Sequence, residues 1–302
     1  MATMTEPPKP ATRVTPYHDY HAEAHVLSGH LQRPIEQVIE RHAPVKLSDR
    51  RGGHLTRVTE DVSIEGLINF TKGKTRVSGS RSLKNKGWVT LSTSIMEGLN
   101  VFEIITADRL VSQVSTDHSF NDGHVPRVTF LGTQFNNLMV SGFPVKVTWD
   151  FGICGDIPAG GKSYLQDKKF LGRVKEQTQS ITKASGLPKE LKDQYDEKLG
   201  YIDKLISVCD ADDTSIHEPI TCSLVQKIDV SIPGVQTFGN VMVIQEFGAV
   251  ALGEIVVGEK MYEGATRPDT YFELTGIKMS LGCVGHGTVA GATVAANGHH
   301  HP

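Results

Sequence analysis

The sequence predicts a mainly β protein with one α-helical hairpin inserted into it, and three observations predict this fold class. Short runs in which apolar and polar residues alternate occur before residue 160 and again after residue 213, as in strands with one buried face. Glycine and asparagine separate these runs. Between them, over 161–212, the apolar spacing changes to the three- and four-residue steps of a helix.

The N-terminal segment 1–20 is polar and rich in proline, and we expect it to form a disordered tail. It contains no apolar stretch that would serve as the core of a signal peptide. The sequence therefore predicts a cytoplasmic protein, with non-classical export or a surface location left open. No apolar run approaches the ~20 residues of a membrane-spanning helix, so we expect no membrane span.

The first β-rich half is expected over 21–160. Its clearest strand is 145–150, where Val145, Val147 and Trp149 occupy alternate positions and share one face. Further strands are expected at 65–70, 87–93, 110–115 and 127–131.

The helical hairpin is expected over 161–212, where charged residues also become denser. An apolar stripe at helical spacing marks each helix. The first stripe contains Phe170, Leu171, Val174 and Ile181, and the second contains Leu191, Tyr195, Leu199, Ile202 and Ile206. Gly186 is the expected stop of the first helix, and Pro188 lies at the first turn of the second.

The second β-rich half is expected over 213–298, packed with the first half into one body. Alternation returns at 227–232 and 277–282, whereas 241–244 and 255–257 are continuously apolar, as in strands covered on both faces. Residues 299–302 are expected to form a His-rich tail. A sandwich, a barrel and a β-solenoid all remain open at this point.

Residues 155–163 resemble a phosphate-binding loop between a strand and a helix. In that motif backbone N–H groups, a lysine and the helix N-terminus surround the phosphates. The spacing differs here, because Asp156 stands in the place of the first glycine and its carboxylate would repel phosphate. We favour a glycine linker in which Ser163 caps the following helix.

His21 and His25 are the candidate metal ligands, because they would share one face of a helix and neutral imidazoles bind zinc, nickel or copper. Two such ligands do not make a complete site, and no cofactor is expected. The cysteines are expected to be reduced, although Cys209 and Cys222 could pair under oxidising conditions. They are Cys154, Cys209, Cys222 and Cys283.

Catalysis would need a base and an orienting acid, and Asp108, Asp117 and His118 supply such groups around one predicted strand. We favour a turn as the reason for Asp117 and His118. The basic segment 72–86 contains no acidic residue and would suit nucleic-acid phosphates. A hairpin whose lysines guard an exposed edge explains it better, so nucleic acid is not a favoured partner.

Two segments carry a resemblance to a known group of proteins. Residues 105–108 read ITAD, and 135–145 read FNNLMVSGFPV. These segments resemble uncharacterised bacterial surface proteins of the "choice-of-anchor" kind over about forty residues. The resemblance implies a β-rich, non-enzymatic body and assigns no functional residue.

We therefore expect a non-catalytic β-rich structural or binding protein that assembles with itself into a homo-oligomer or larger assembly, or binds a protein partner. The hairpin would be the projecting element, since its apolar stripe must be buried somewhere. One alternative is an enzyme with a pocket in the β body that uses Asp108, Asp117 or His118. Another is phosphate or nucleic-acid binding through 72–86 or 155–163.

Overall fold

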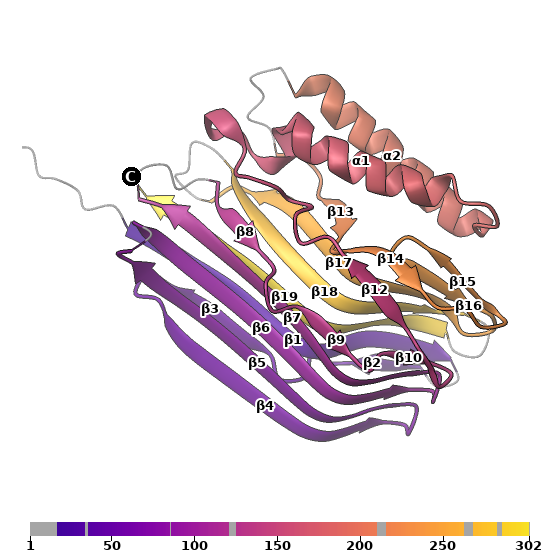
Figure 1. Ribbon diagram of the computed structural model, residues 1–302. Helices are drawn as coiled ribbons and strands as arrows, with labels where there is room; N and C mark the ends of the chain where they lie inside the picture. Colours follow the sequence, from indigo (N-terminus) through magenta and orange to yellow (C-terminus); the bar gives the residue numbers. More distant parts are fainter. Residues whose placement is uncertain are drawn as a thin grey trace, which may run out of the picture.

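Two antiparallel β-sheets face each other and form a sandwich with a pair of helices beside it (Figure 1). The computed structural model describes residues 17–33, 36–84, 86–120, 125–209, 216–262, 268–282 and 286–301. The predicted mainly β fold with a helical hairpin is confirmed, and of the three architectures left open the structure adopts the sandwich.

The first sheet, sheet A, has the strand order β15-β16-β17-β18-β19-β1-β2, with β13 paired to β17 and β3 paired to β1. Its strands are β1 (Tyr17–Arg33), β2 (Gln37–Ile39), β3 (Val45–Asp49), β13 (Ile220–Ser223), β15 (Val235–Phe238), β16 (Val241–Ile244), β17 (Gly248–Lys260), β18 (Asp269–Leu281) and β19 (His286–His301). Strands from both ends of the chain therefore share one sheet.

The second sheet, sheet B, has the order β11-β10-β7-β6-β5-β4, with β8 and β9 paired to β7. Its strands are β4 (Gly53–Ile64), β5 (Ile68–Ser82), β6 (Gly87–Val101), β7 (Ile105–Ser119), β8 (Arg127–Thr129), β9 (Gln134–Asn136), β10 (Met139–Val140) and β11 (Phe143–Pro144). A small third sheet pairs β12 (Lys146–Trp149) with β14 (Val225–Asp229). The strand expected at 65–70 begins at Ile68, because Glu65 and Gly66 have positive φ angles and form the turn before it.

The described ends of the chain differ from the tails expected at 1–20 and 299–302, of which residues 1–16 and 302 lie outside the described residues. Strand β1 begins at Tyr17, and β19 runs through His301. The two strands pair with each other from Tyr17 and His301 to Arg33 and His286. Each supplies the backbone hydrogen-bond partners of the other, and local composition contains no information about that pairing.

The interior between the sheets contains many small and hydroxyl-bearing side chains, which let the sheets approach closely. A Cβ atom on Gly79 of β5 would lie 2.5 Å from the ring of Tyr20 on β1. Hydroxyls also link the sheets, since the Ser94 hydroxyl donates to the carbonyl of His25 at 2.9 Å. The buried hydroxyl residues of sheet B include Thr75, Thr90, Ser92, Ser94, Ser112 and Thr116.

A backbone irregularity crosses each sheet. Asp61 of β4 and Gly98 of β6 have positive φ angles in sheet B, as do Gly253 and Ala292 in sheet A. In β6 the buried positions are even-numbered from Trp88 to Met96 and odd-numbered after Gly98. The irregularity therefore changes which side chains of a strand face the interior.

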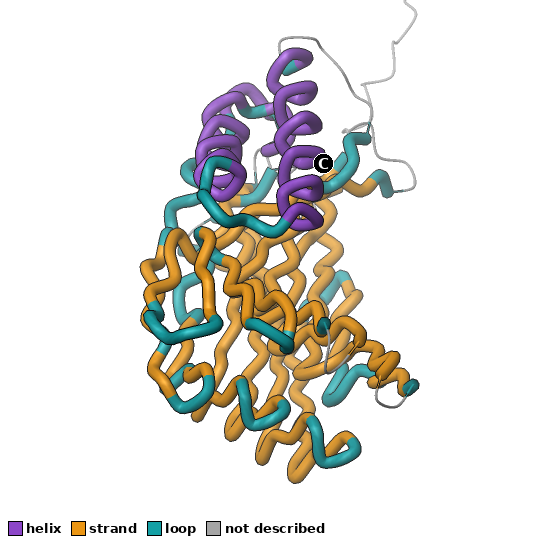
Figure 2. Tube along the Cα trace, turned by 90° about the vertical axis from the view of Figure 1, so that its right-hand side faces the viewer, coloured by secondary structure: helices purple, strands orange, loops and turns teal. Residues whose placement is uncertain are grey.

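The predicted hairpin consists of α1 (Lys168–Thr182) and α2 (Lys189–Val208), preceded by the short turns η1 (Ala159–Gly161) and η2 (Tyr164–Gln166). Figure 2 shows both helices packed beside the strands. Most residues of their apolar stripes are buried in, or pack against, cores shared with the sandwich. The buried residues are Phe170, Leu171, Val174, Ile181, Tyr195, Ile202 and Leu205. Burial of this stripe therefore needs no second chain, which removes the reason for expecting a projecting hairpin.

Among the residues that the structure describes, neither helix combines the length and the apolar character needed to cross a membrane.

Candidate functional site

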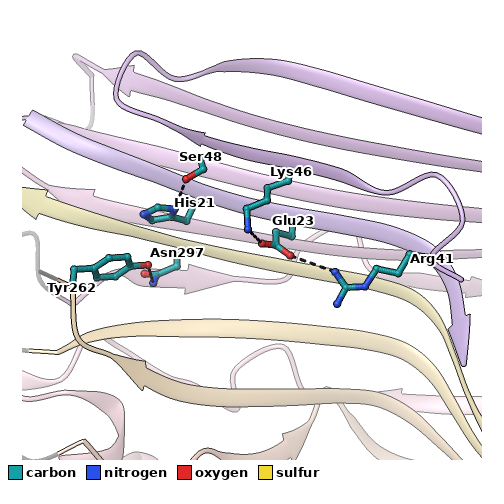
Figure 3. Close-up of polar contacts among 7 residues, drawn as sticks. All are labelled: His21, Glu23, Arg41, Lys46, Ser48, Tyr262 and Asn297. Carbon is teal, nitrogen blue, oxygen red and sulfur yellow. Dashed lines mark hydrogen bonds and ion pairs between the residues drawn. The ribbon is translucent and has the colours of Figure 1, made fainter.

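A groove of about 400 Å³ lies on the outer face of sheet A, across β1, β19, β18 and the end of β17. It is the best candidate for a functional site because aromatic, acidic and amide side chains converge on it. Figure 3 shows its polar contacts. The lining side chains include His21, Glu23, Lys260, Tyr262, Tyr271, Glu273, Ala295 and Asn297.

The base of the groove consists of residues that lie directly opposite one another on neighbouring strands. Such residues project from the same face of the sheet. Ala295 of β19 is opposite Glu23 of β1 on one side and opposite Glu273 of β18 on the other. The row continues to Lys46 on β3 and to Val256 on β17. The methyl group of Ala295 thus leaves a hollow between two glutamates whose Cα atoms are roughly 9.5 Å apart, two strand spacings.

The tyrosine ring of Tyr271 lies across the neighbouring strand β17. Its register partner is Gly258, and a Cβ atom on Gly258 would lie 2.4 Å from the ring carbon Cζ. Only glycine leaves room for this close approach. The half-buried ring therefore covers Gly258 and lines the groove beside Glu273.

A second tyrosine, Tyr262, is held between two imidazole rings. Its ring centroid is 5.1 Å from that of His21 and 4.9 Å from that of His299, and both pairs are stacked. The Tyr262 hydroxyl accepts a hydrogen bond from the Asn297 amide at 3.1 Å, and the Ser48 hydroxyl contacts His21 Nδ1 at 3.1 Å (Figure 3). These contacts fix the aromatic rim of the groove.

The Tyr262 hydroxyl lies close to the buried pair of Asp269 and His299. Burial, with the nearby Asp269 carboxylate, raises the pKa of Tyr262 well above its usual range, so the phenol stays protonated. The buried His299 ring contacts the buried Asp269 carboxylate through Nδ1. Burial lowers the pKa of His21, and the Lys260 ammonium lowers it further.

The two glutamates beside Ala295 have different surroundings. Glu23 forms ion pairs with Lys46 at 2.5 Å and with Arg41 at 3.7 Å (Figure 3). Among the residues that the structure describes, no side chain forms a hydrogen bond or ion pair with the Glu273 carboxylate. Burial raises the pKa of Glu273. Glu273 therefore offers acceptor atoms that a ligand would satisfy.

A comparison with protein families finds one family that matches this chain. The sequence model of one family, described as Domain of unknown function (DUF8256), matches residues 18–258. The chain belongs to the DUF8256 family. No curated protein and no solved structure matches it.

The DUF8256 match covers only part of the groove. It includes His21, Glu23 and Gly258 but ends before Tyr262, Tyr271 and Glu273. The aromatic and unpaired acidic side of the groove therefore belongs to β18 and the segment before it, outside the matched residues.

His21 and His25 of this DUF8256 protein are on strand β1 rather than on a helix, which corrects the geometry expected for a metal site. They project from the same face with Glu23 between them, and their Cα atoms are roughly 13 Å apart. That spacing is too wide for two imidazoles to bind one ion. Among the described residues no group of three His, Cys, Asp or Glu side chains is arranged to hold a metal ion.

The structure does not bring Asp108, Asp117 and His118 together. Asp108 and Asp117 are nine positions apart on β7, or roughly 30 Å along the strand. Asp117 and His118 are adjacent on strand β7 rather than in the turn expected for them, so they face opposite sides of sheet B. Asp108 accepts a hydrogen bond from the Asn137 amide at 2.7 Å, whereas His118 is buried with its ring 4.6 Å from that of His18.

The basic segment 72–86 begins on β5, next to the edge strand β4. Lys72 forms an ion pair with Glu60 of β4 at 2.9 Å, and Arg76 Nε donates to His54 at 3.1 Å. Farther along, the Arg81 guanidinium stacks over the Phe120 ring at 4.8 Å. Because β5 is paired with β4 on one side and with β6 on the other, its basic side chains are not on an edge strand, which corrects that expectation.

The loop 155–163 directs its phosphate-binding groups toward the protein itself. The Ser163 hydroxyl donates to the Glu259 carboxylate, and Lys162 Nζ donates to the Cys209 carbonyl at 2.8 Å. Helix α1 begins at Lys168, and the side chain of Asp167 caps it. The serine therefore precedes the short turn η2 and does not cap α1. The lysine, the serine hydroxyl and the N-terminus of α1 are thus each engaged by a protein acceptor.

The structure describes Cys154, Cys209 and Cys222, and all three are buried. Among the described residues no disulfide joins Cys209 to Cys222, and the Cys209 thiol donates to the Leu205 carbonyl at 3.1 Å. Cys283 lies outside the described residues.

Of the groove residues, the sequence analysis singled out only His21, as a metal ligand. It missed Glu23, Tyr262, Tyr271, Glu273 and Asn297. No local signal marks them, because the groove exists only where β1, β17, β18 and β19 lie side by side.

Proposed function

We propose that this DUF8256 protein is a non-catalytic binding protein that holds a neutral saccharide in the groove on sheet A. The observation that carries this proposal is the Tyr271 ring covering Gly258, beside the unpaired Glu273 carboxylate. A sugar ring has an apolar C–H face and hydroxyl donors around its rim. The tyrosine ring can pack against the C–H face, and the glutamate can accept hydrogen bonds from the hydroxyls.

The charge of the groove supports a neutral ligand. Glu23 is balanced by Lys46 and Arg41, and Lys260 lies on the same rim as Glu273. A strongly charged ligand would therefore meet groups of both signs, whereas hydroxyl groups form hydrogen bonds with either. The groove is also open along the strands, which suits an extended oligosaccharide.

The test uses fluorescently labelled hexasaccharides of glucose, galactose and N-acetylglucosamine, with polarisation as the measurement. We expect the wild-type protein to bind at least one of them, and Tyr271→Ala to bind it about tenfold more weakly or worse, since a tenfold loss is about 1.4 kcal/mol. Phe143→Ala is the matched control, because Phe143 is an exposed aromatic residue of sheet B. Absence of wild-type binding to all three, or equal binding by Tyr271→Ala, would overturn the proposal.

A second candidate, glycoside hydrolysis, is favoured by the unlike environments of Glu23 and Glu273. Burial keeps Glu273 closer to its protonated form, while Lys46 pairs with Glu23 as a carboxylate. Inverting glycosidases use one carboxylic acid and one carboxylate on opposite sides of the scissile bond. The test is whether the wild type releases reducing ends from the same hexasaccharides and Glu273→Gln does not. That result would favour glycoside hydrolysis over non-catalytic binding.

A further inference from the structure

Strand β4 ends sheet B and is open on its outer edge, and its first six residues are exposed. No strand that the structure describes pairs with it on the side opposite β5. All residues from Gly53 to Val58 are exposed, and the side chains of Leu55 and Val58 are 44% and 50% exposed. Figure 1 shows β4 along the lower border of the molecule. Alternate residues of this twelve-residue strand thus direct backbone donors and acceptors away from β5, to the outside.

The charges along β4 are arranged so that the strand complements itself. Arg57 stands before the middle of the strand, and Glu60 and Asp61 follow it. When a strand pairs with its own copy about a two-fold axis, one residue opposes itself on the axis. An axis at Arg57 would place two arginines opposite each other, and an axis at Glu60 would oppose two glutamates; both arrangements are repulsive.

We propose that β4 pairs antiparallel with β4 of a second copy of this chain, about a two-fold axis at Thr59. In this register Arg57 of each chain is opposite Asp61 of the other, and the two Thr59 hydroxyls meet on the axis. Thr59 lies near the middle of Gly53–Ile64, so almost the whole strand finds a partner. The same patch serves both chains, as a two-fold interface requires.

The pairing would extend sheet B continuously from one chain into the next. The groove of the proposed function lies on the outer face of sheet A, so it stays open in such a dimer. This inference is therefore independent of saccharide binding, and either proposal can fail without the other.

The test is the mass in solution, measured by light scattering and sedimentation equilibrium on the full chain. We expect the wild type to have twice the chain mass of 32.9 kDa. Arg57→Asp places two aspartates opposite each other and Asp61→Arg places two arginines, so each raises the dimer dissociation constant about tenfold or more. The double variant Arg57→Asp/Asp61→Arg restores opposite charges and should restore the dimer.

The comparison between Asp61→Arg and the double variant isolates the charge pairing, since both contain the same non-glycine residue at a positive φ of 50°. Lys204→Asp, an exposed charge reversal on α2, is the control that should leave the dimer intact. Circular dichroism identical to wild type excludes unfolding as the cause of a lower mass. A monomeric wild type, or a double variant as monomeric as Asp61→Arg, would refute the pairing.

Discussion

The hydroxyl of Ser92 on β6 donates a hydrogen bond to the carbonyl of Ala295 on β19, with an O–O distance of 2.6 Å. The two residues belong to opposite sheets. Ala295 also forms the base of the groove on the outer face of sheet A. This bond therefore ties the base of the groove to the interior of the sandwich.

Removing that bond should lower stability. We expect Ser92→Ala to reduce the free energy of unfolding by about 1–3 kcal/mol, because the Ala295 carbonyl loses its buried donor. Urea unfolding measures the change. Ser115→Ala on β7, whose side chain faces outward, is the control and should change stability by less than about 0.5 kcal/mol. Equal effects of the two substitutions would show that the cross-sheet bond contributes nothing specific.

Filling the hollow at Ala295 should block the groove without unfolding the protein. In Ala295→Leu the larger side chain would occupy the space between Glu23 and Glu273. We expect loss of saccharide binding in the polarisation assay, with the urea midpoint close to that of wild type because the position is partly exposed. Binding of wild-type strength by this variant would mean that the ligand does not use the hollow.

The stability of the protein should fall as the solution becomes acidic, in part because of His25. Burial, with the nearby Arg41 guanidinium, lowers the pKa of His25 to about 4 in the folded state. The unfolded chain has an ordinary histidine pKa of about 6.5, so between these values only the unfolded state takes up the proton, and stability is lost as pH falls through that window.

His25→Gln should weaken this dependence. Between about pH 7 and pH 5 the variant should lose less unfolding free energy than wild type, as measured by urea titration at each pH. An unchanged pH dependence in His25→Gln would show that His25 does not contribute to acid destabilisation.

Gly98 is required by both conformation and space. Its φ is 66°, and a Cβ atom would lie 2.6 Å from the Thr71 hydroxyl oxygen. Gly98→Ala should reduce the free energy of unfolding by about 2–4 kcal/mol through the combined strain. Gly66→Ala separates the two causes, because Gly66 has a φ of 70° but no atom within 4 Å of its added Cβ. It should cost only about 1–2 kcal/mol, and equal losses would exclude the steric contribution at Gly98.

Local periodicity was sufficient to predict the hairpin and the β class. The stripe Phe170, Leu171, Val174 and Ile181 is buried on α1 as its spacing indicated. The alternation at Val147 and Trp149 is likewise found on strand β12. Such patterns are readable because the residues that share one face of an element lie within a few positions in the chain.

Long-range pairing was beyond local patterns. Tyr17 lies opposite His301, and Glu23 lies between Lys46 and Ala295. The local sequence of these segments does not indicate which strand each one pairs with. The likeness of 105–108 and 135–145 to surface proteins stays a prediction. The sequence by itself determined the element types, because backbone and side-chain preferences act over neighbouring residues. Only the tertiary structure decided that the chain ends share sheet A and that a groove forms there, because strand register brings together side chains from positions 21 to 297.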